Sequence, residues 1–228
     1  MSSEKYSIIF IMDESGSMTS MGDEPWQGLN NFVRKQKESN VEFNFTLIFF
    51  NSEVKFFYKN LEASKIPELT SNDYNPCDTT ALYDAIGKGI EFQKKQGMDN
   101  VIFVILTDGM ENSSQEYNKN TIQKMIKNLE SKNSWKFVYL GANQDSFQVG
   151  NSIGINKTCN YDYTPKGFRD IMRSVSNSVC RNITGETKDI NLNDDIEPST
   201  PFKSNNSNTF ISSNLNQVDL NKTFFKKL

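Results

Sequence analysis

The chain of 228 residues contains no histidine. This absence removes the commonest general base of enzymes, every Ser-His or Cys-His nucleophilic pair and the commonest zinc ligand. The sequence also has no G-x-x-x-x-G-K-[ST] loop, so it lacks that kind of cradle for the phosphates of a nucleotide. We therefore expect a protein that is not an enzyme.

Cysteines, long apolar runs and excess charge are also scarce. The three cysteines, Cys77, Cys159 and Cys180, have no metal-type spacing, and their odd number fits reduced thiols. No apolar run reaches the roughly 18 residues of a membrane-spanning helix, and the N-terminal residues do not resemble a signal peptide. The net charge of −3 gives no basic excess for nucleic acid. These absences predict an intracellular protein without a membrane or nucleic-acid partner.

An apolar run rich in Ile and Phe, residues 7–12, stops at Asp13, and Ser15 and Ser17 follow. Such a run is typical of a strand buried on both faces. Ligands bind at the carboxyl ends of parallel strands, so these three side chains are expected in a loop at that edge. Carboxylate and hydroxyl oxygens favour Mg²⁺ or Mn²⁺ over zinc. Alternatively, the serines simply cap the following helix.

Two further stretches repeat this pattern of oxygen-bearing residues. Residues 100–106 form a second apolar run, which ends in Thr107-Asp108-Gly109, and Thr80 immediately precedes a helical pattern. In this order, the three pieces resemble the von Willebrand factor type A domain. Its metal-ion-dependent adhesion site, the MIDAS, combines D-x-S-x-S, a Thr at a loop-to-helix junction and the Asp of T-D-G.

The resemblance covers about residues 4–182 and implies a ligand set. Ser15, Ser17 and Thr80 would give direct or nearly direct hydroxyl contacts to Mg²⁺ or Mn²⁺. Asp13 and Asp108 would hold the ion through waters or one direct bond. An Asp or Glu of a partner protein would then occupy the open position.

The chain departs from the family pattern at Asp78 and Thr79, where many relatives have Gly-Gly. We expect this departure to alter the path of the loop and to add a carboxylate near the metal.

Strand and helix patterns alternate along most of the chain, which predicts an α/β fold. The expected architecture is a doubly wound, mostly parallel central sheet of about six strands with helices on both faces. The tight turn between strands at 42–50 and 54–58 makes these two strands antiparallel, and the type A resemblance implies that the latter is an edge strand. Further strands are expected at 6–12, 100–106, 135–140 and 157–161, and helices from residue 25 and at 82–96, 120–131 and 165–181.

The composition changes near residue 184, where Asn, Ser, Thr and Asp become dominant. We expect a type A domain over 1–183 and a flexible polar tail over 184–228, because such a segment buries too little apolar surface to fold. A short helix at about 213–227 is predicted within this tail. It would dock onto its own domain or bind a partner.

Three functional interpretations remain open. The leading one is a metal-dependent protein-binding module, monomeric alone, whose partner presents Asp or Glu and belongs to an ATPase or an assembly complex. The second is a scaffold protein with a purely structural metal, in which the tail makes the contacts. The third is a hydrolase that uses Asp78 or Asp84 as its base. The frequent Asn, Lys and Ile are typical of an AT-rich genome, such as that of a virus or phage.

Overall fold

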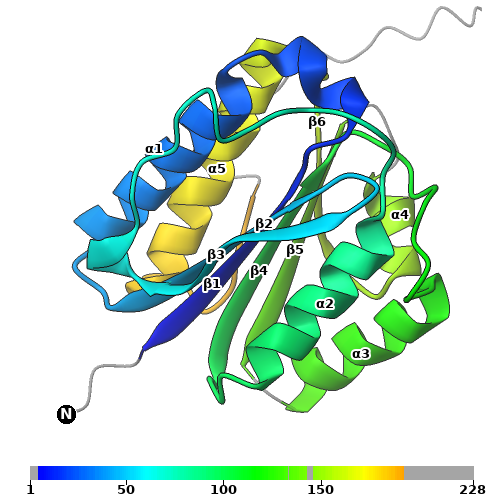
Figure 1. Ribbon diagram of the computed structural model, residues 1–228. Coiled ribbons are helices and arrows are strands. Elements are labelled where there is room, and N and C mark those ends of the chain that lie inside the picture. Colours follow the sequence, from blue (N-terminus) through cyan, green and yellow to red (C-terminus); the bar gives the residue numbers. More distant parts are fainter. Residues whose placement is uncertain (1–4, 133, 143–145, 193–228) are drawn as a thin grey trace, which may run out of the picture. The chain divides into compact units, whose positions relative to one another are not determined.

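The computed structural model describes residues 5–132, 134–142 and 146–192 (Figure 1). The chain divides into a unit from Met1–Glu197 and a unit from Pro198–Leu228, and all described residues belong to the first. The helix predicted at about 213–227 lies outside the described residues, as does most of the predicted tail.

A six-stranded sheet with the order β3-β2-β1-β4-β5-β6 forms the centre of the first unit. All neighbouring strands are parallel except β2 and β3, which form the antiparallel edge pair. The predicted fold class is therefore confirmed. The strands are β1 (Tyr6–Asp13), β2 (Phe43–Phe50), β3 (Val54–Glu62), β4 (Asn100–Thr107), β5 (Trp135–Ala142) and β6 (Lys157–Tyr161).

Helices cover both faces of this sheet, with α1 and α5 on one side and α2 and α3 on the other (Figure 1). The chain crosses between strands through helices, as parallel pairing requires. The helices are α1 (Glu24–Glu38), α2 (Leu82–Lys94), α3 (Lys119–Lys132), α4 (Ser146–Ser152) and α5 (Pro165–Ile183), with short 3-10 helices η1 (Gly16–Met21) and η2 (Ala63–Lys65).

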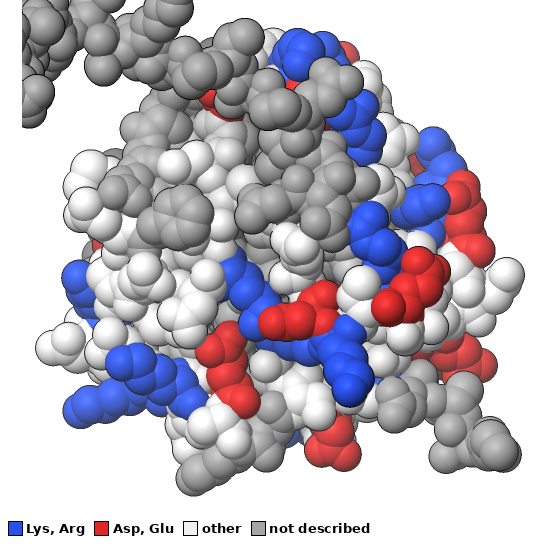
Figure 2. Space-filling model, turned by 180° about the vertical axis from the view of Figure 1, so that it is seen from behind, with Lys and Arg blue, Asp and Glu red and all other residues white. Residues whose placement is uncertain are grey.

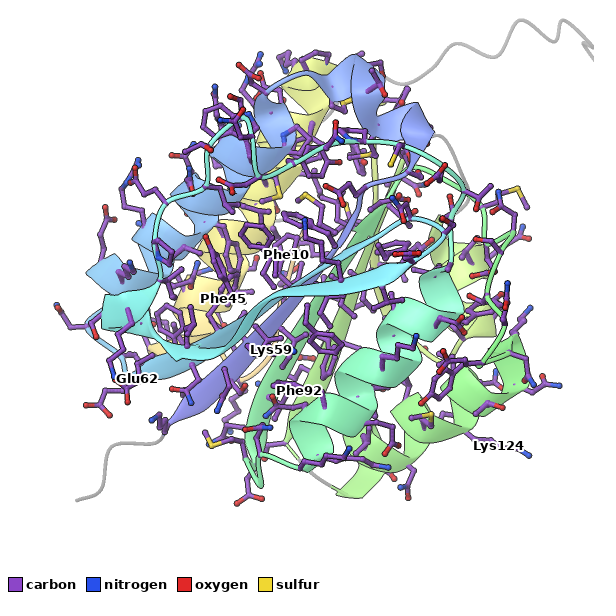
Figure 3. The ribbon with its side chains drawn as sticks, in the orientation of Figure 1. Phe10, Phe45, Lys59, Glu62, Phe92 and Lys124 are labelled. Atoms are coloured by element: carbon purple, nitrogen blue, oxygen red, sulfur yellow. The ribbon has the colours of Figure 1, made fainter. Side chains whose placement is uncertain are left out.

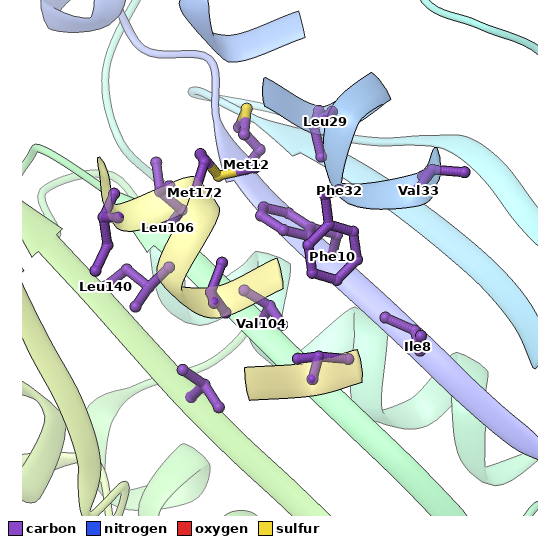
Figure 4. Close-up of a cluster of buried hydrophobic side chains, with 14 of the residues drawn as sticks. Ile8, Phe10, Met12, Leu29, Phe32, Val33, Val104, Leu106, Leu140 and Met172 are labelled. Carbon is purple, nitrogen blue, oxygen red and sulfur yellow. The ribbon is translucent and has the colours of Figure 1, made fainter. Parts of the chain in front are cut away.

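The central strand β1 is buried on both faces, which explains its continuous apolar sequence. Ile8, Phe10 and Met12 face α1 and α5, whereas Ile9 and Ile11 face α2. Figure 4 shows the first of these clusters, in which Phe10 packs edge-on against Phe32 of α1 with ring centroids 5.2 Å apart. Each such fully buried side chain contributes about 1.5–3 kcal/mol to folding, so the strand that ends at Asp13 is firmly anchored.

The edge strand β3 is only partly buried and carries lysines along its length. Lys59 lies over the ring of Phe56, which in turn packs against Phe92 of α2. Figure 3 shows Phe92 and Phe45 on opposite sides of the sheet. Lysines on an edge strand oppose pairing with another sheet, so this edge ends the sheet at β3.

After α5, the chain remains packed against the domain as far as Leu192. Ile190 and Leu192 are each 5% exposed and join the core beneath α5. The hydroxyl of Ser174 donates a hydrogen bond to the Leu192 carbonyl at 2.6 Å, and that of Ser178 to the Asn191 carbonyl. The domain was expected to end at residue 183. Ile190 and Leu192 pack into the core beyond that point, although the polar residues around them stay mostly exposed.

Charges of both signs are interspersed on the face drawn in Figure 2. Ion pairs such as Lys166–Asp170 and Arg173–Asp170 join neighbouring charges on α5. None of the helices within the described residues combines the length and apolar character needed to cross a membrane.

Candidate metal centre

The site begins in the loop that connects β1 to η1. Asp13, the last residue of β1, is completely buried, and one of its carboxylate oxygens accepts a hydrogen bond from the Ser15 amide at 2.7 Å. The Gly16 amide donates to the Asp78 carbonyl at 3.1 Å, which ties this loop to the loop before α2. Ser15 stands at the N-cap of η1 but its side chain makes no capping hydrogen bond. The Ser15 hydroxyl is therefore not occupied as a cap.

A chain of hydroxyl groups links the β1 loop to the end of β4. The oxygens of the Ser15 and Ser17 hydroxyls lie 3.1 Å apart, and the Ser17 hydroxyl donates to an Asp108 carboxylate oxygen at 2.7 Å. The Thr107 hydroxyl donates to the second Asp13 oxygen at 2.5 Å. Because neighbouring parallel strands β1 and β4 end at the same edge, the two carboxylates meet there.

Thr80 completes this group from the loop before α2. Its side chain is 4% exposed, and its amide donates to the Asn112 side-chain oxygen at 2.9 Å, so the loop after β4 fixes it. A Cβ atom placed on Gly109 would lie 3.0 Å from the Thr80 hydroxyl oxygen and 3.7 Å from an Asp13 carboxylate oxygen. The structure thus brings together all five side chains named from the sequence: Asp13, Ser15, Ser17, Thr80 and Asp108.

This group of oxygens is short of positive charge. Burial raises the pKa of Asp13 to about 6, and the charge of Asp108 also raises it. Within the described part of the chain, neither carboxylate forms an ion pair with Lys or Arg. A buried carboxylate without a counter-charge is unfavourable. Two carboxylates and three hydroxyls at one point fit a hard divalent cation such as Mg²⁺ or Mn²⁺.

Asp78 does not add a third carboxylate to this group. No cluster of three or more His, Cys, Asp or Glu suited to a metal occurs among the described residues. The Asp78 backbone has φ +63°, a left-handed conformation that Gly adopts readily and that Asp tolerates. Its carboxylate accepts a long hydrogen bond from the Ser52 hydroxyl at 3.5 Å. The substitution of Gly by Asp therefore preserves the turn but directs the new carboxylate elsewhere.

Two other acidic residues hold the surrounding loops. Asp84 accepts hydrogen bonds from the amides of Gln115, Glu116 and Tyr117 at 2.8–3.0 Å. Glu111 accepts from the Tyr83 amide and from the amide and hydroxyl of Ser114. Both carboxylates therefore fasten the loop after β4 to the start of α2.

Three tyrosines that the sequence did not single out lie at or near the site. The Tyr74 hydroxyl donates to the Asp13 carbonyl at 2.6 Å. The Tyr163 hydroxyl donates to the Ser17 carbonyl and accepts from the Ser20 hydroxyl. Tyr161 lies at the end of β6 and is 6% exposed. These contacts join residues far apart in the chain, so no local pattern signals them.

Met110 lies two residues after Asp108 in the loop that follows β4. Its side chain is 77% exposed, and it is the large apolar side chain that stands out as exposed within the described residues. Methionine is a flexible apolar group that adapts to varied contacts. An exposed apolar side chain therefore lies two residues after Asp108 in the chain.

Solved structures share this fold at low sequence identity. The pilus adhesin SpaC from Lactobacillus rhamnosus GG is 14% identical with a TM-score of 0.62, over 80% of this chain and 31% of that chain. The PilB minor pilin from Streptococcus sanguinis is 12% identical with a TM-score of 0.60, over 80% and 63%. Proximal thread matrix protein 1 from the mussel byssus, with a zinc-occupied MIDAS motif, is 15% identical with a TM-score of 0.52, over 77% and 46%.

This chain thus spans less than two thirds of the length of each of those structures. No curated protein sequence matches it. The family model of the von Willebrand factor type A domain matches residues 7–177, which include the sheet apart from Tyr6 and all five side chains of the candidate centre. The chain belongs to the von Willebrand factor type A domain family.

Proposed function

We propose that this protein is a metal-dependent protein-binding module that captures an acidic side chain of its partner. The observation that carries the proposal is the Asp13–Asp108 pair, which meets three hydroxyls at the carboxyl edge of the sheet without an ion pair in the described residues. A bound cation would compensate the charge of such a pair. The zinc-occupied MIDAS motif of the mussel protein supports a cation at the corresponding place.

Asp13, Ser15, Ser17, Thr80 and Asp108 would hold the ion. When bound, Mg²⁺ or Mn²⁺ supplies an electrophilic centre for a carboxylate of the partner. The protein's own residues do the positioning: Thr107 and the Ser15 amide orient Asp13, and Ser17 orients Asp108. Met110, two residues after Asp108, offers an exposed apolar contact, so the preferred partner presents an acidic residue next to an apolar one. An ATPase or an assembly complex is the class of partner that we infer.

We infer binding rather than catalysis at this site. A hydrolase would need a base beside the cation, and the sequence offered Asp78 and Asp84 for that role. Asp84 is saturated by three backbone amides, and Asp78 is directed toward Ser52. Neither carboxylate is arranged to activate a water at the five side chains.

The test is a comparison of Thr80→Ala with Thr79→Ala. Both substitutions remove one threonine hydroxyl from the same loop, but Thr80 is buried at the site and Thr79 is exposed. Mn²⁺ affinity is measured by calorimetry. Partner capture from an extract of the cells in which the protein occurs is measured in Mg²⁺ and in EDTA. The bound proteins are identified by mass spectrometry. We expect Thr80→Ala to weaken metal binding and capture at least about tenfold, equivalent to 1.4 kcal/mol, and Thr79→Ala to change neither.

The folding cost of Thr80→Ala should stay within about 1 kcal/mol, the typical cost of a lost helix cap, because the N-cap of α2 is Ala81 and the Thr80 hydroxyl does not cap the helix. Wild-type protein that binds no Mn²⁺ would refute the metal site. Metal binding combined with capture that persists in EDTA would instead favour the scaffold interpretation, in which contacts are made by other parts of the chain.

A further inference from the structure

The hydroxyl group of Tyr161 is buried and has no hydrogen-bond partner among the described residues. The side chain is 6% exposed, and its ring packs edge-on against Phe168 of α5 with centroids 5.9 Å apart. A buried hydroxyl without a partner is unfavourable, so proteins rarely retain one. The ring alone would be served equally well by phenylalanine.

The surroundings of this hydroxyl place it beside the candidate centre. Burial is the main reason that the pKa of Tyr161 is well above its ordinary value, and the negative charges of Asp108 and Asp13 raise it further. Tyr161 in turn affects the pKa of Tyr74, whose hydroxyl donates to the Asp13 carbonyl. Strand β6 also ends at the same edge as β5, with Tyr161 paired to Ala142. Tyr161 therefore lies at the same edge of the sheet as the Asp13–Asp108 pair, close enough for the charges of both carboxylates to act on its hydroxyl.

We propose that Tyr161 is a positioning residue of the metal centre, whose hydroxyl binds an ordered water lying between it and the Asp13–Asp108 pair. This inference rests on the proposed function, because that water belongs to the hydration of the cation.

A phenol suits this position because it both donates and accepts a hydrogen bond. A water bridging two polar groups is nearly as favourable as a direct hydrogen bond. Groups outside the ligand set that orient ligands or their waters commonly change metal affinity by 10-fold or more. Tyr161 would thus favour a cation that keeps part of its hydration, as Mg²⁺ and Mn²⁺ do.

The test uses Tyr161→Phe, which removes the hydroxyl and keeps the ring against Phe168. Thr158→Val is the matched control: Thr158 is also buried on β6, its hydroxyl also has no partner among the described residues, and its register partner is Tyr139. Mn²⁺ affinity is measured by electron paramagnetic resonance of free and bound Mn²⁺. The melting temperature is measured in EDTA.

We expect Tyr161→Phe to weaken Mn²⁺ binding about tenfold, with a melting temperature in EDTA that is unchanged or raised. Thr158→Val should leave Mn²⁺ affinity unchanged. Wild-type binding that Tyr161→Phe retains in full would overturn this inference and leave the proposed function standing. A fall of more than about 4 °C in EDTA, the size of a lost structural hydrogen bond, would also overturn it. Wild-type protein that binds no Mn²⁺ would overturn both.

Discussion

Two aspartates near the same edge of the sheet are buried to a similar degree but have opposite surroundings. Asp84, 6% exposed, accepts three backbone N–H groups from the loop after β4. Asp13, completely buried, accepts one amide and one hydroxyl, and burial still raises its pKa to about 6. Hydrogen bonds therefore compensate the charge of Asp84 well, whereas they compensate that of Asp13 only in part.

This difference is the one expected between a structural carboxylate and a binding carboxylate. Hydrogen bonds to a charged acceptor stabilise the fold, so Asp84 holds a loop in place. An under-compensated buried carboxylate lowers stability, and such groups concentrate at functional sites. We therefore interpret Asp13 as a residue whose position serves binding at the expense of the metal-free fold.

The largest expected effect is the destabilisation caused by Asp84→Ala. Three backbone N–H groups lose their acceptor, and a donor left without one costs about 1–3 kcal/mol where water cannot replace the acceptor. We expect the free energy of unfolding, measured by urea denaturation, to fall by at least about 3 kcal/mol. Asp99→Ala, at an exposed residue before β4, serves as the control. A loss below about 1 kcal/mol would show that the three amides find water instead.

Asp13→Asn is expected to have the opposite effect on stability. The raised pKa of Asp13 means that the folded state binds its proton more tightly than the unfolded state. Wild-type stability in EDTA should therefore fall as the pH rises from about 4 to about 6, and stay low above that. At pH 7 the neutral asparagine should gain up to about 3 kcal/mol over wild type, at 1.36 kcal/mol per pKa unit.

The measurement is urea denaturation of both proteins in EDTA at pH 4 and at pH 7. The advantage of Asp13→Asn should be present at pH 7 and absent at pH 4. A variant that is less stable than wild type at pH 7 would show that the hydrogen bonds from Ser15 and Thr107 outweigh the cost of the buried charge.

Much of this arrangement follows from local sequence patterns. The continuous apolar run before Asp13 predicts a strand buried on both faces, and that strand fixes where the D-x-S-x-S loop lies. Contacts between distant segments leave no such pattern. Tyr74 reaches Asp13 across 61 positions, and Tyr163 reaches Ser17 across 146. Similarly, Ile190 and Leu192 are buried although their polar segment predicts a flexible chain. Strand register and side-chain packing determine these contacts, and a short sequence motif predicts neither.

The smallest expected effect on stability comes from Gly109→Ala. This variant tests whether the Thr80 hydroxyl can be displaced without a change in the free energy of unfolding. Gly109 follows Asp108, and an added Cβ would approach the Thr80 hydroxyl oxygen to 3.0 Å, closer than most such contacts. Gly109→Ala should therefore displace the Thr80 hydroxyl by a few tenths of an ångström. Because Gly109 does not have a positive φ, alanine adds no backbone strain, and the free energy of unfolding should change by less than about 0.5 kcal/mol.

Mn²⁺ affinity, measured by calorimetry, should fall about threefold to tenfold in Gly109→Ala, since one member of the proposed ligand set moves. Gly97→Ala is unsuitable as a control because its φ of +66° would strain alanine. Gly16→Ala is a better one: its Cβ would meet the Asp78 carbonyl oxygen at an ordinary 3.5 Å in the loop that carries Ser15 and Ser17. Equal Mn²⁺ affinities for wild type, Gly16→Ala and Gly109→Ala would mean that the Thr80 hydroxyl is not a ligand, and that the carboxylates Asp13 and Asp108 hold the ion without it.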